Sequence, residues 1–160
     1  MKVSSLMNSR VLTVKPDATL CEVQELMLRF HLDDIIVVND KNELEGIVTY
    51  SDIIRKVLPS HEELVKGEYT MPNMEVFEER LLDILDTPAK EIMTSNVRTV
   101  SPDTCIMEAG ALMRAHNVTK LPVVENKKVV GIITFTDISW GLFSKTCTRD
   151  KKRILHSSLN

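Results

Sequence analysis

Two short patterns of hydroxyl and carboxyl side chains offer the clearest chemistry in this sequence. Thr49 and Asp52 form one pattern, and Thr134 and Asp137 form the other, with two residues between the members of each pair. Each threonine ends an apolar run that is typical of a buried strand, and a helix is expected to follow directly. Such a junction offers unpaired backbone amides and the positive end of a helix dipole, which suit a phosphate group.

The side chains of these patterns add two kinds of polar contact. A threonine hydroxyl can donate to phosphate, and an aspartate can accept hydrogen bonds from the two hydroxyls of a ribose. A simpler role is also available, because threonine and aspartate at these positions cap helices. A single pattern would favour the capping role, whereas its occurrence at the same place in both copies of a repeat favours binding.

The two patterns close the two copies of an internal repeat. Matching residues are offset by 86 positions as far as Val38 and Val124, and by 85 positions from Gly46 and Gly131 onward. One residue has therefore been lost from the loop in between. Matches in this order, with a single gap, indicate a duplicated unit.

Each copy is expected to fold as β-α-β-β-α, which gives a mixed α/β (α+β) fold class. Short β-branched runs predict first strands, and nearly continuous apolar runs predict the buried second strands. The expected strands are 11–14, 35–38 and a strand ending at Thr49 in the first copy, and 97–100, 121–124 and a strand ending at Thr134 in the second. Thr19 and Glu22 fit a capping box at the start of the first helix. The closing helices are expected at 52–58 and 137–143.

The segment between the copies matches neither of them. Ser60 to Glu63 resembles another capping box, and Met74, Phe77, Leu81, Ile84 and Leu85 have helical spacing on an acidic segment. We expect an amphipathic connecting helix that packs on the module, although its apolar face can instead serve a partner. The predicted organisation is repeat one at 1–58, a connecting segment at 59–88, repeat two at 89–144 and a basic tail at 145–160.

Bulk composition narrows the classes of partner. The 160 residues carry a net charge of −3 and a pI near 5.8, so no global positive field attracts nucleic acid. The basic run from Lys145 to Arg153 is interpreted as a solvated tail. No apolar stretch approaches the roughly 20 residues that cross a bilayer, and the N-terminus does not look like a secretion signal. Three widely spaced cysteines suggest neither a disulfide framework nor a zinc site, which favours the cytoplasm.

The sequence contains few of the motifs that are typical of enzymes. The five glycines are too scattered for a P-loop or a dinucleotide-binding turn, and no nucleophile elbow or HExxH motif is present. The four histidines form no close pair of metal ligands. We therefore expect a non-enzymatic protein without catalytic or metal-binding residues.

With these motifs in view, the chain resembles a tandem pair of CBS (cystathionine β-synthase-type) domains. The resemblance rests on the paired openings at 12–17 and 98–103, on the strand Leu121-Pro122-Val123-Val124 and on both closing patterns. It covers about residues 3–57 and 89–143. It implies two repeats related by pseudo-twofold symmetry with three-stranded sheets, and pairs of this kind commonly form dimers. It also implies a regulatory ligand such as AMP, ADP, ATP or S-adenosylmethionine in the clefts between repeats, with no obligatory cofactor.

The same resemblance assigns residues to parts of the ligand. Thr49 and Thr134 would meet phosphate, and Asp52 and Asp137 would hold ribose. The adenine would be enclosed by backbone and apolar groups around Thr13, Val14, Thr99, Val100, Ile35, Ile36, Leu121 and Pro122.

The two copies differ beside the second strand. Lys120 in repeat two can face ligand phosphates, as a basic residue often does at this place in the family. Asp34 stands at that place in repeat one and would repel a polyphosphate. Repeat one also has Ile36 where repeat two has Pro122. We expect one good pocket and a second that is either poor or prefers a ligand with less negative charge. The sequence leaves open which pocket Lys120 serves.

Two functional hypotheses follow. In the first, the chain is a sensor in which an adenine ligand shifts the population of conformations or dimer forms, for an unidentified effector protein. In the second, it is a ligand-independent dimerisation and interaction scaffold. The acidic residues Asp33 and Asp34 favour the second hypothesis slightly.

Overall fold

The chain is organised as two compact units that are each built around one repeat. The computed structural model describes residues 1–58, 62, 65 and 74–144. The repeat-one unit is the continuous stretch Leu12–Val97, and the repeat-two unit combines Met1–Val11 with the chain from Arg98 onward. The units therefore do not coincide with the sequence repeats, and the four-part division expected from the sequence stays a prediction.

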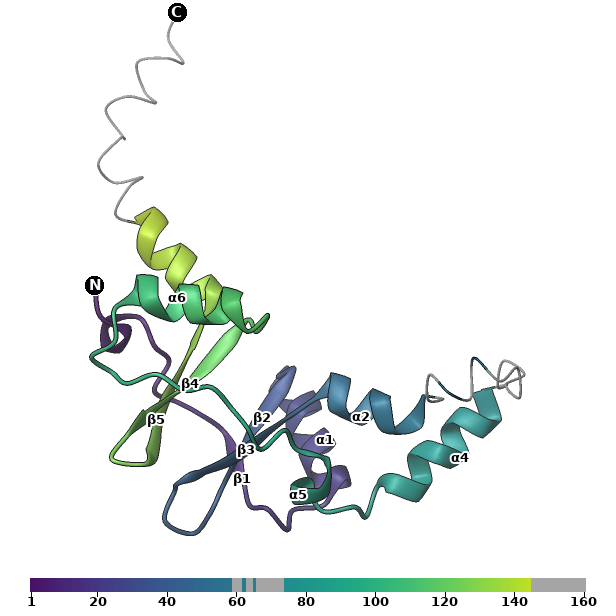
Figure 1. The fold of residues 1–160 in the computed structure, drawn as a ribbon. Coiled ribbons are helices and arrows are strands. Elements are labelled where there is room, and N and C mark those ends of the chain that lie inside the picture. The colour runs from purple at the N-terminus through teal and green to yellow at the C-terminus, as the bar shows by residue number, and fades with distance from the viewer. Residues whose placement is uncertain (59–61, 63–64, 66–73, 145–160) are drawn as a thin grey trace, which may run out of the picture. The chain divides into compact units, whose positions relative to one another are not determined.

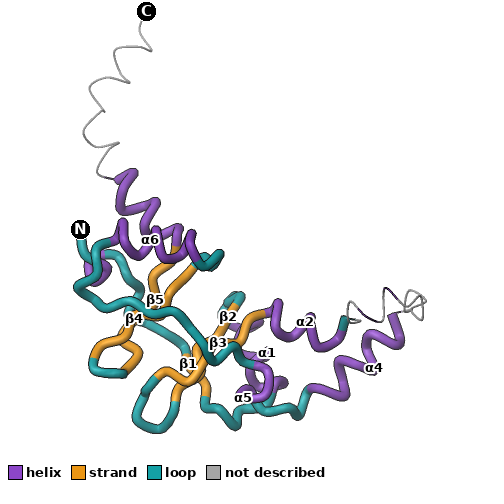
Figure 2. The backbone as a smooth tube through the Cα atoms, viewed as in Figure 1, coloured by secondary structure: helices purple, strands orange, loops and turns teal. Residues whose placement is uncertain are grey.

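The repeat-one unit contains a three-stranded sheet and its helices (Figures 1 and 2). Strand β2 lies in the centre, parallel to β1 and antiparallel to β3. The elements are β1 (Thr13–Val14), α1 (Leu20–Arg29), β2 (Asp34–Val38), β3 (Leu44–Thr49), α2 (Tyr50–Val57), α4 (Met74–Ile84) and α5 (Ala89–Ile92).

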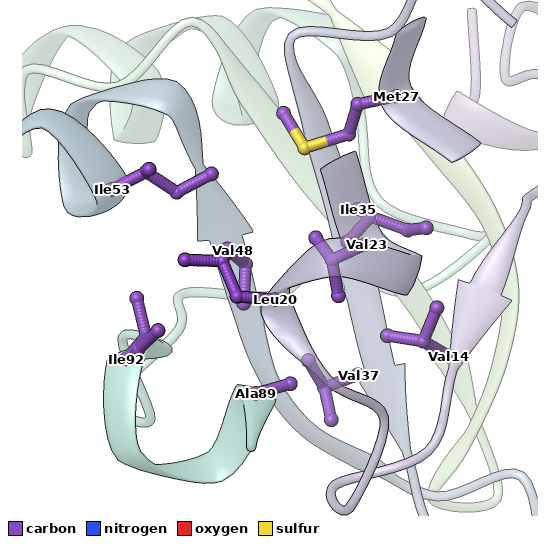
Figure 3. Packing of buried hydrophobic residues seen from close by; sticks show 10 residues of the cluster. All are labelled: Val14, Leu20, Val23, Met27, Ile35, Val37, Val48, Ile53, Ala89 and Ile92. Carbon is purple, nitrogen blue, oxygen red and sulfur yellow. The ribbon is translucent and has the colours of Figure 1, made fainter. Parts of the chain in front are cut away.

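The core of the repeat-one unit lies between α1 and the sheet (Figure 3). In the sequence, Leu20, Val23, Met27 and Phe30 have the spacing of an apolar helix face. The structure buries the first three fully, whereas Phe30, the C-cap of α1, is 54% exposed. The cluster consists of Val14, Leu20, Val23, Met27, Ile35, Val37, Val48, Ile53, Ala89 and Ile92. Leu81 and Ile84 of α4 pack against this cluster, so the amphipathic connecting helix is also confirmed. The capping box expected at Ser60 lies outside the described residues, as does the basic tail.

The repeat-two unit has its own sheet and core. Strands β4 (Lys120–Glu125) and β5 (Lys128–Thr134) form an antiparallel pair. The other elements are the short 3-10 helix η1 (Val3–Ser5), the helix α6 (Ile106–Ala115) and helical residues 135–144. The core cluster consists of Val3, Val100, Ile106, Ala109, Met113, Leu121, Val123, Ile133 and Ile138.

The prediction of a regular strand at 97–100, the first strand of repeat two, is wrong. Only a single parallel bridge joins Val100 to Val123. The reason is Pro122, which has no amide hydrogen to donate to the residue before Thr99. Ile36 stands at the equivalent place in repeat one and has that hydrogen, so β1 extends its pairing to two residues.

Each unit is completed by a segment from another part of the sequence. In the repeat-one unit, Ile47 and Thr94 exchange two backbone hydrogen bonds of 3.1 and 2.9 Å. In the repeat-two unit, Asn8 and Ile132 exchange two such bonds of 2.9 and 3.0 Å. The segments 88–97 and 1–11 thus occupy matching places on β3 and β5.

Glycine is needed where these segments cross the strands. A Cβ atom at Gly46 would lie 2.6 Å from the sulfur of Met93 and 2.9 Å from the carbonyl oxygen of Thr94. At Gly131 it would lie 2.8 Å from the sulfur of Met7. The glycines that open the two closing patterns therefore make room for the crossing segments.

Candidate functional site

The junction between β3 and α2 holds the first predicted pair in a capping box. The Thr49 amide and hydroxyl donate to Asp52 Oδ2 at 2.9 and 2.7 Å, and the Asp52 amide donates to the Thr49 oxygen at 3.2 Å. The closing helix therefore begins at Tyr50, two residues before the start expected from the sequence, because Thr49 is the N-cap.

The capping box leaves one oxygen of Asp52 for other partners. The Thr94 hydroxyl lies 3.4 Å from Oδ1, and an Arg55 guanidinium nitrogen lies 3.8 Å from it. Both contacts are long, and the Asp52 side chain is only 8% exposed. The hydrogen of the Thr49 hydroxyl is already directed at Oδ2, so donating it to a phosphate requires the box to open.

The junction between β5 and helical residues 135–144 repeats this geometry. The Thr134 amide and hydroxyl donate to Asp137 Oδ2 at 2.8 and 2.7 Å, and the Asp137 amide donates to the Thr134 oxygen at 3.1 Å. The structure thus places both predicted pairs at helix starts. The box uses only one carboxylate oxygen of each aspartate, so capping is compatible with a ribose contact by the other oxygen but competes with donation of the threonine hydroxyl to phosphate.

The residues that differ between the copies lie directly across the sheet from the junction threonines. Asp34 is paired in register with Thr49, and Lys120 is paired with Thr134. The first residue of the strand that pairs with each junction is therefore acidic in repeat one and basic in repeat two. Asp34 is buried at 7% exposure, whereas Lys120 is half-buried.

The predicted adenine-lining residues fall into two groups. The side chains of Val14, Ile35, Val100 and Leu121 belong to the core clusters and offer little surface to a ligand. Ile36 and Pro122 are buried, but neither belongs to a cluster. Side chains alternate along a strand, so these two point to the sheet face opposite their core neighbours. Thr13 is half-buried and Thr99 is exposed.

Sequence reasoning missed a pocket beside Asp52. The pocket has a volume of about 280 Å³ and is lined by Asp52, Arg55, Lys56 and Ile92. The available signal was the spacing, since residues three and four positions after Asp52 share its face of a helix. The contribution of Ile92 had no local signal, because it comes from α5, far along the chain.

A second, wider pocket of about 660 Å³ lies by β1 and α1. It is lined by Thr13, Val14, Lys15, Asp17, Ala18, Glu22, Glu25, Leu26 and Arg29. It contains two of the predicted adenine-lining residues. Its charged lining consists of two cations and three carboxylates, and Arg29 pairs with Glu25 at 2.5 Å. No helix in the described part of the chain is long and apolar enough to cross a membrane.

Comparisons with known proteins agree with the repeat. Residues 3–59 and 89–142 each match the CBS domain. The uncharacterized protein MJ1426 of Methanocaldococcus jannaschii is 29% identical over 150 residues, covering 86% of this chain and 89% of MJ1426. The protein MJ1404 of the same organism is 27% identical over 137 residues, which are 86% of this chain and 31% of MJ1404.

Two solved structures share the fold. The CBS domain pair of MJ0100, in complex with 5′-methylthioadenosine and S-adenosyl-L-methionine, superposes with a TM-score of 0.66 at 23% identity. That match covers 91% of this chain and 98% of the other. CBSX2 in complex with AMP gives a TM-score of 0.70 at 20% identity, with the same coverage of 91% and 98%. At these identities the likeness establishes the fold.

Proposed function

Because this chain belongs to the CBS domain family, we propose that it is a regulatory module that binds an adenine nucleotide or adenosyl ligand. The ligand, which is AMP, ADP, ATP or S-adenosylmethionine, shifts the chain between conformations or dimer forms and so signals to an effector protein. No obligatory cofactor and no catalytic step are part of this proposal.

The observation that carries the proposal is the duplicated junction. Two Thr-x-x-Asp patterns in register form the same capping box, and each leaves an aspartate oxygen outside the box. A carboxylate oxygen at this place can accept from a ribose hydroxyl, and the positive end of a helix dipole lies next to it. Capping alone needs no lining pocket, whereas Asp52 lines one.

The ligand class is supported by the two solved structures that share the fold. MJ0100 is described with two adenosyl compounds, and CBSX2 is described with AMP. All three compounds contain an adenosine group and differ in what its 5′ carbon carries. The common requirement is recognition of adenosine, which the ribose-binding role proposed for Asp52 and Asp137 meets.

An exposed apolar surface supports the dimer part of the proposal. Trp140 and Phe143, in helical residues 135–144, are 74% and 67% exposed. Exposed aromatic side chains of this size are typical of protein interfaces. The same surface favours the second candidate, a ligand-independent scaffold whose partner is a second copy of the chain.

The test is a calorimetric titration of nucleotide-stripped protein with AMP, ADP, ATP and S-adenosylmethionine in turn. We expect saturable binding of at least one of them, and at least tenfold weaker binding by Asp52→Ala or Asp137→Ala. Thr19→Ala is the matched control, because it removes the cap of α1 without touching either junction. No heat with any ligand at two temperatures, together with a ligand-independent dimer, would reject the sensor in favour of the scaffold.

A further inference from the structure

We propose that Arg55 and Lys56 make the repeat-one junction a phosphate-binding site that selects an adenosine monophosphate over uncharged or cationic adenosyl ligands. This inference rests on the proposed function and names the ligand that one of its two junctions prefers.

The pocket beside Asp52 brings the required groups together. Its charged lining consists of one carboxylate and two cations, and Ile92 supplies an apolar side. Asp52 brings one negative charge against the two positive charges of Arg55 and Lys56. The lining therefore keeps an excess of positive charge, which attracts an anion.

The guanidinium of Arg55 can turn from Asp52 to a phosphate. Its nitrogen lies 3.8 Å from Asp52 Oδ1, beyond hydrogen-bond distance, and its side chain is 76% exposed. Exposed ion pairs of this kind hold their partners weakly. A guanidinium binds phosphate through two parallel hydrogen bonds, and an ammonium adds a point charge.

The second repeat shows that these cations are a local feature of repeat one. The matching helix positions hold Trp140 and Gly141, so no cation follows Asp137 at this spacing. The basic residue of repeat two is Lys120, on the strand across from Thr134. Each junction thus has a cation near it, supplied by the helix in repeat one and by the strand in repeat two.

Pocket size and charge together indicate the ligand. A volume of about 280 Å³ lies just below the range of about 300–1,000 Å³ for small-molecule sites. A nucleoside monophosphate suits this size better than a triphosphate. Two cations favour the phosphate of AMP and repel the sulfonium of S-adenosylmethionine, while adenosine carries no charge for them to act on.

A competing explanation is that Arg55 and Lys56 only stabilise α2. Both residues lie in its last turn, where cations interact favourably with the helix dipole. That role affects the stability of the protein and leaves the preference between AMP and adenosine unchanged. The two explanations therefore predict different ratios of the affinity for AMP to the affinity for adenosine. A change in stability alone leaves this ratio unchanged.

The experiment measures AMP, adenosine and S-adenosylmethionine by calorimetry in the Asp137→Ala background, which isolates the repeat-one junction. Arg55→Gln with Lys56→Gln should weaken AMP by about 10- to 100-fold, as expected for lost hydrogen bonds to a charged group. Adenosine should change by less than about twofold on this same scale. Lys41→Gln, in the turn between β2 and β3, is the control for net charge, and Arg55→Gln alone serves if the double variant unfolds.

The outcomes separate this inference from the function on which it rests. If the parent protein binds AMP and adenosine and the double variant weakens both equally or neither, the inference is overturned and the sensor stands. If Asp137→Ala alone abolishes AMP binding, the phosphate site belongs to repeat two and the inference is again overturned. A parent protein that binds no adenine compound would reject both.

Discussion

The two strand-to-helix junctions are alike in geometry and unlike in surroundings. The hydroxyl-to-carboxylate distance is 2.7 Å in both, and the other two capping distances differ by 0.1 Å between the copies. Asp34 lies across the sheet from one junction and Lys120 lies across from the other. The duplicated Thr-x-x-Asp pattern therefore accounts for the start of each helix, whereas the neighbouring residues determine which ligand each junction favours.

Substitutions in the two cores should cause the largest loss of stability. Met27 and Met113 occupy the same position of α1 and α6, and both are 0% exposed. We expect Met27→Ala and Met113→Ala each to lower the free energy of unfolding by about 2–5 kcal/mol, because each leaves a cavity. Urea denaturation of both variants checks this, and a difference above about 2 kcal/mol between them would show that the two cores are not equivalent.

The two glycines under the crossing segments should differ in how much stability an added methyl group costs. Gly46→Ala places a methyl group 2.9 Å from a backbone oxygen that cannot move aside easily, and Gly131→Ala meets its nearest backbone oxygen at 3.1 Å. We expect a loss of about 2–3 kcal/mol for Gly46→Ala and about 1–2 kcal/mol for Gly131→Ala, as for overpacked cores.

Gly110→Ala is the control for these two variants. The new methyl group would meet only Ile138 Cδ1, at an ordinary 3.6 Å. Alanine also favours the helix α6, so this variant should be neutral or more stable in thermal denaturation. Equal losses for Gly46→Ala and Gly131→Ala would mean that both segments yield to the same degree.

The capping boxes should differ less than the glycines. Asp52→Ala and Asp137→Ala each remove a reciprocal cap, which costs about 0.5–2 kcal/mol. Asp52 should be at the upper end, because it is buried and also accepts from Thr94, whereas Asp137 is half-buried. Chemical denaturation without ligand measures both losses, and a larger loss for Asp137→Ala would contradict the ranking.

The smallest effect concerns the ion pairs that attach the crossing segments. Lys90 lies 2.5 Å from Asp17 in the repeat-one unit, and Lys2 lies 2.6 Å from Asp103 in the repeat-two unit. The hydrogen bond and charge of Asp17 raise the pKa of Lys90 above 10.5. Its stabilising contribution is therefore complete below pH 10.5 and is lost as the pH rises through the raised pKa.

Thermal denaturation between about pH 9 and 12 tests this pair. Lys90→Gln should slightly reduce the melting temperature at pH 9 and should flatten the fall toward pH 12. The difference should shrink in high salt, because both side chains are exposed. A pH profile identical to that of Lys41→Gln would show that the pair contributes nothing.

Local patterns in the sequence predicted the elements well. The capping box at Thr19 and Glu22, the buried face of α1 and the amphipathic helix α4 all depend on residues within a few positions of each other. Both junction pairs were found for the same reason. Their capping geometry follows from side chains that reach backbone amides three residues away.

The features that were missed depend on distant parts of the chain. Nothing near Asn8 shows that it pairs with β5, and nothing near Ile92 shows that it lines a pocket with Asp52. The shortened first strand in repeat two depends on a proline that acts through a hydrogen bond to another strand. Local signals in a sequence hold no information on such long-range pairings, so the structure was required to find them.

The way each unit is completed bears on the order in which the two units can fold during synthesis. The repeat-one unit is one continuous stretch, so every residue it needs has left the ribosome once Val97 has. The repeat-two unit joins Asn8 to Ile132 and must hold its first segment unpaired until most of the chain exists. Changes in residues 1–11 therefore act on the unit that can complete its core later.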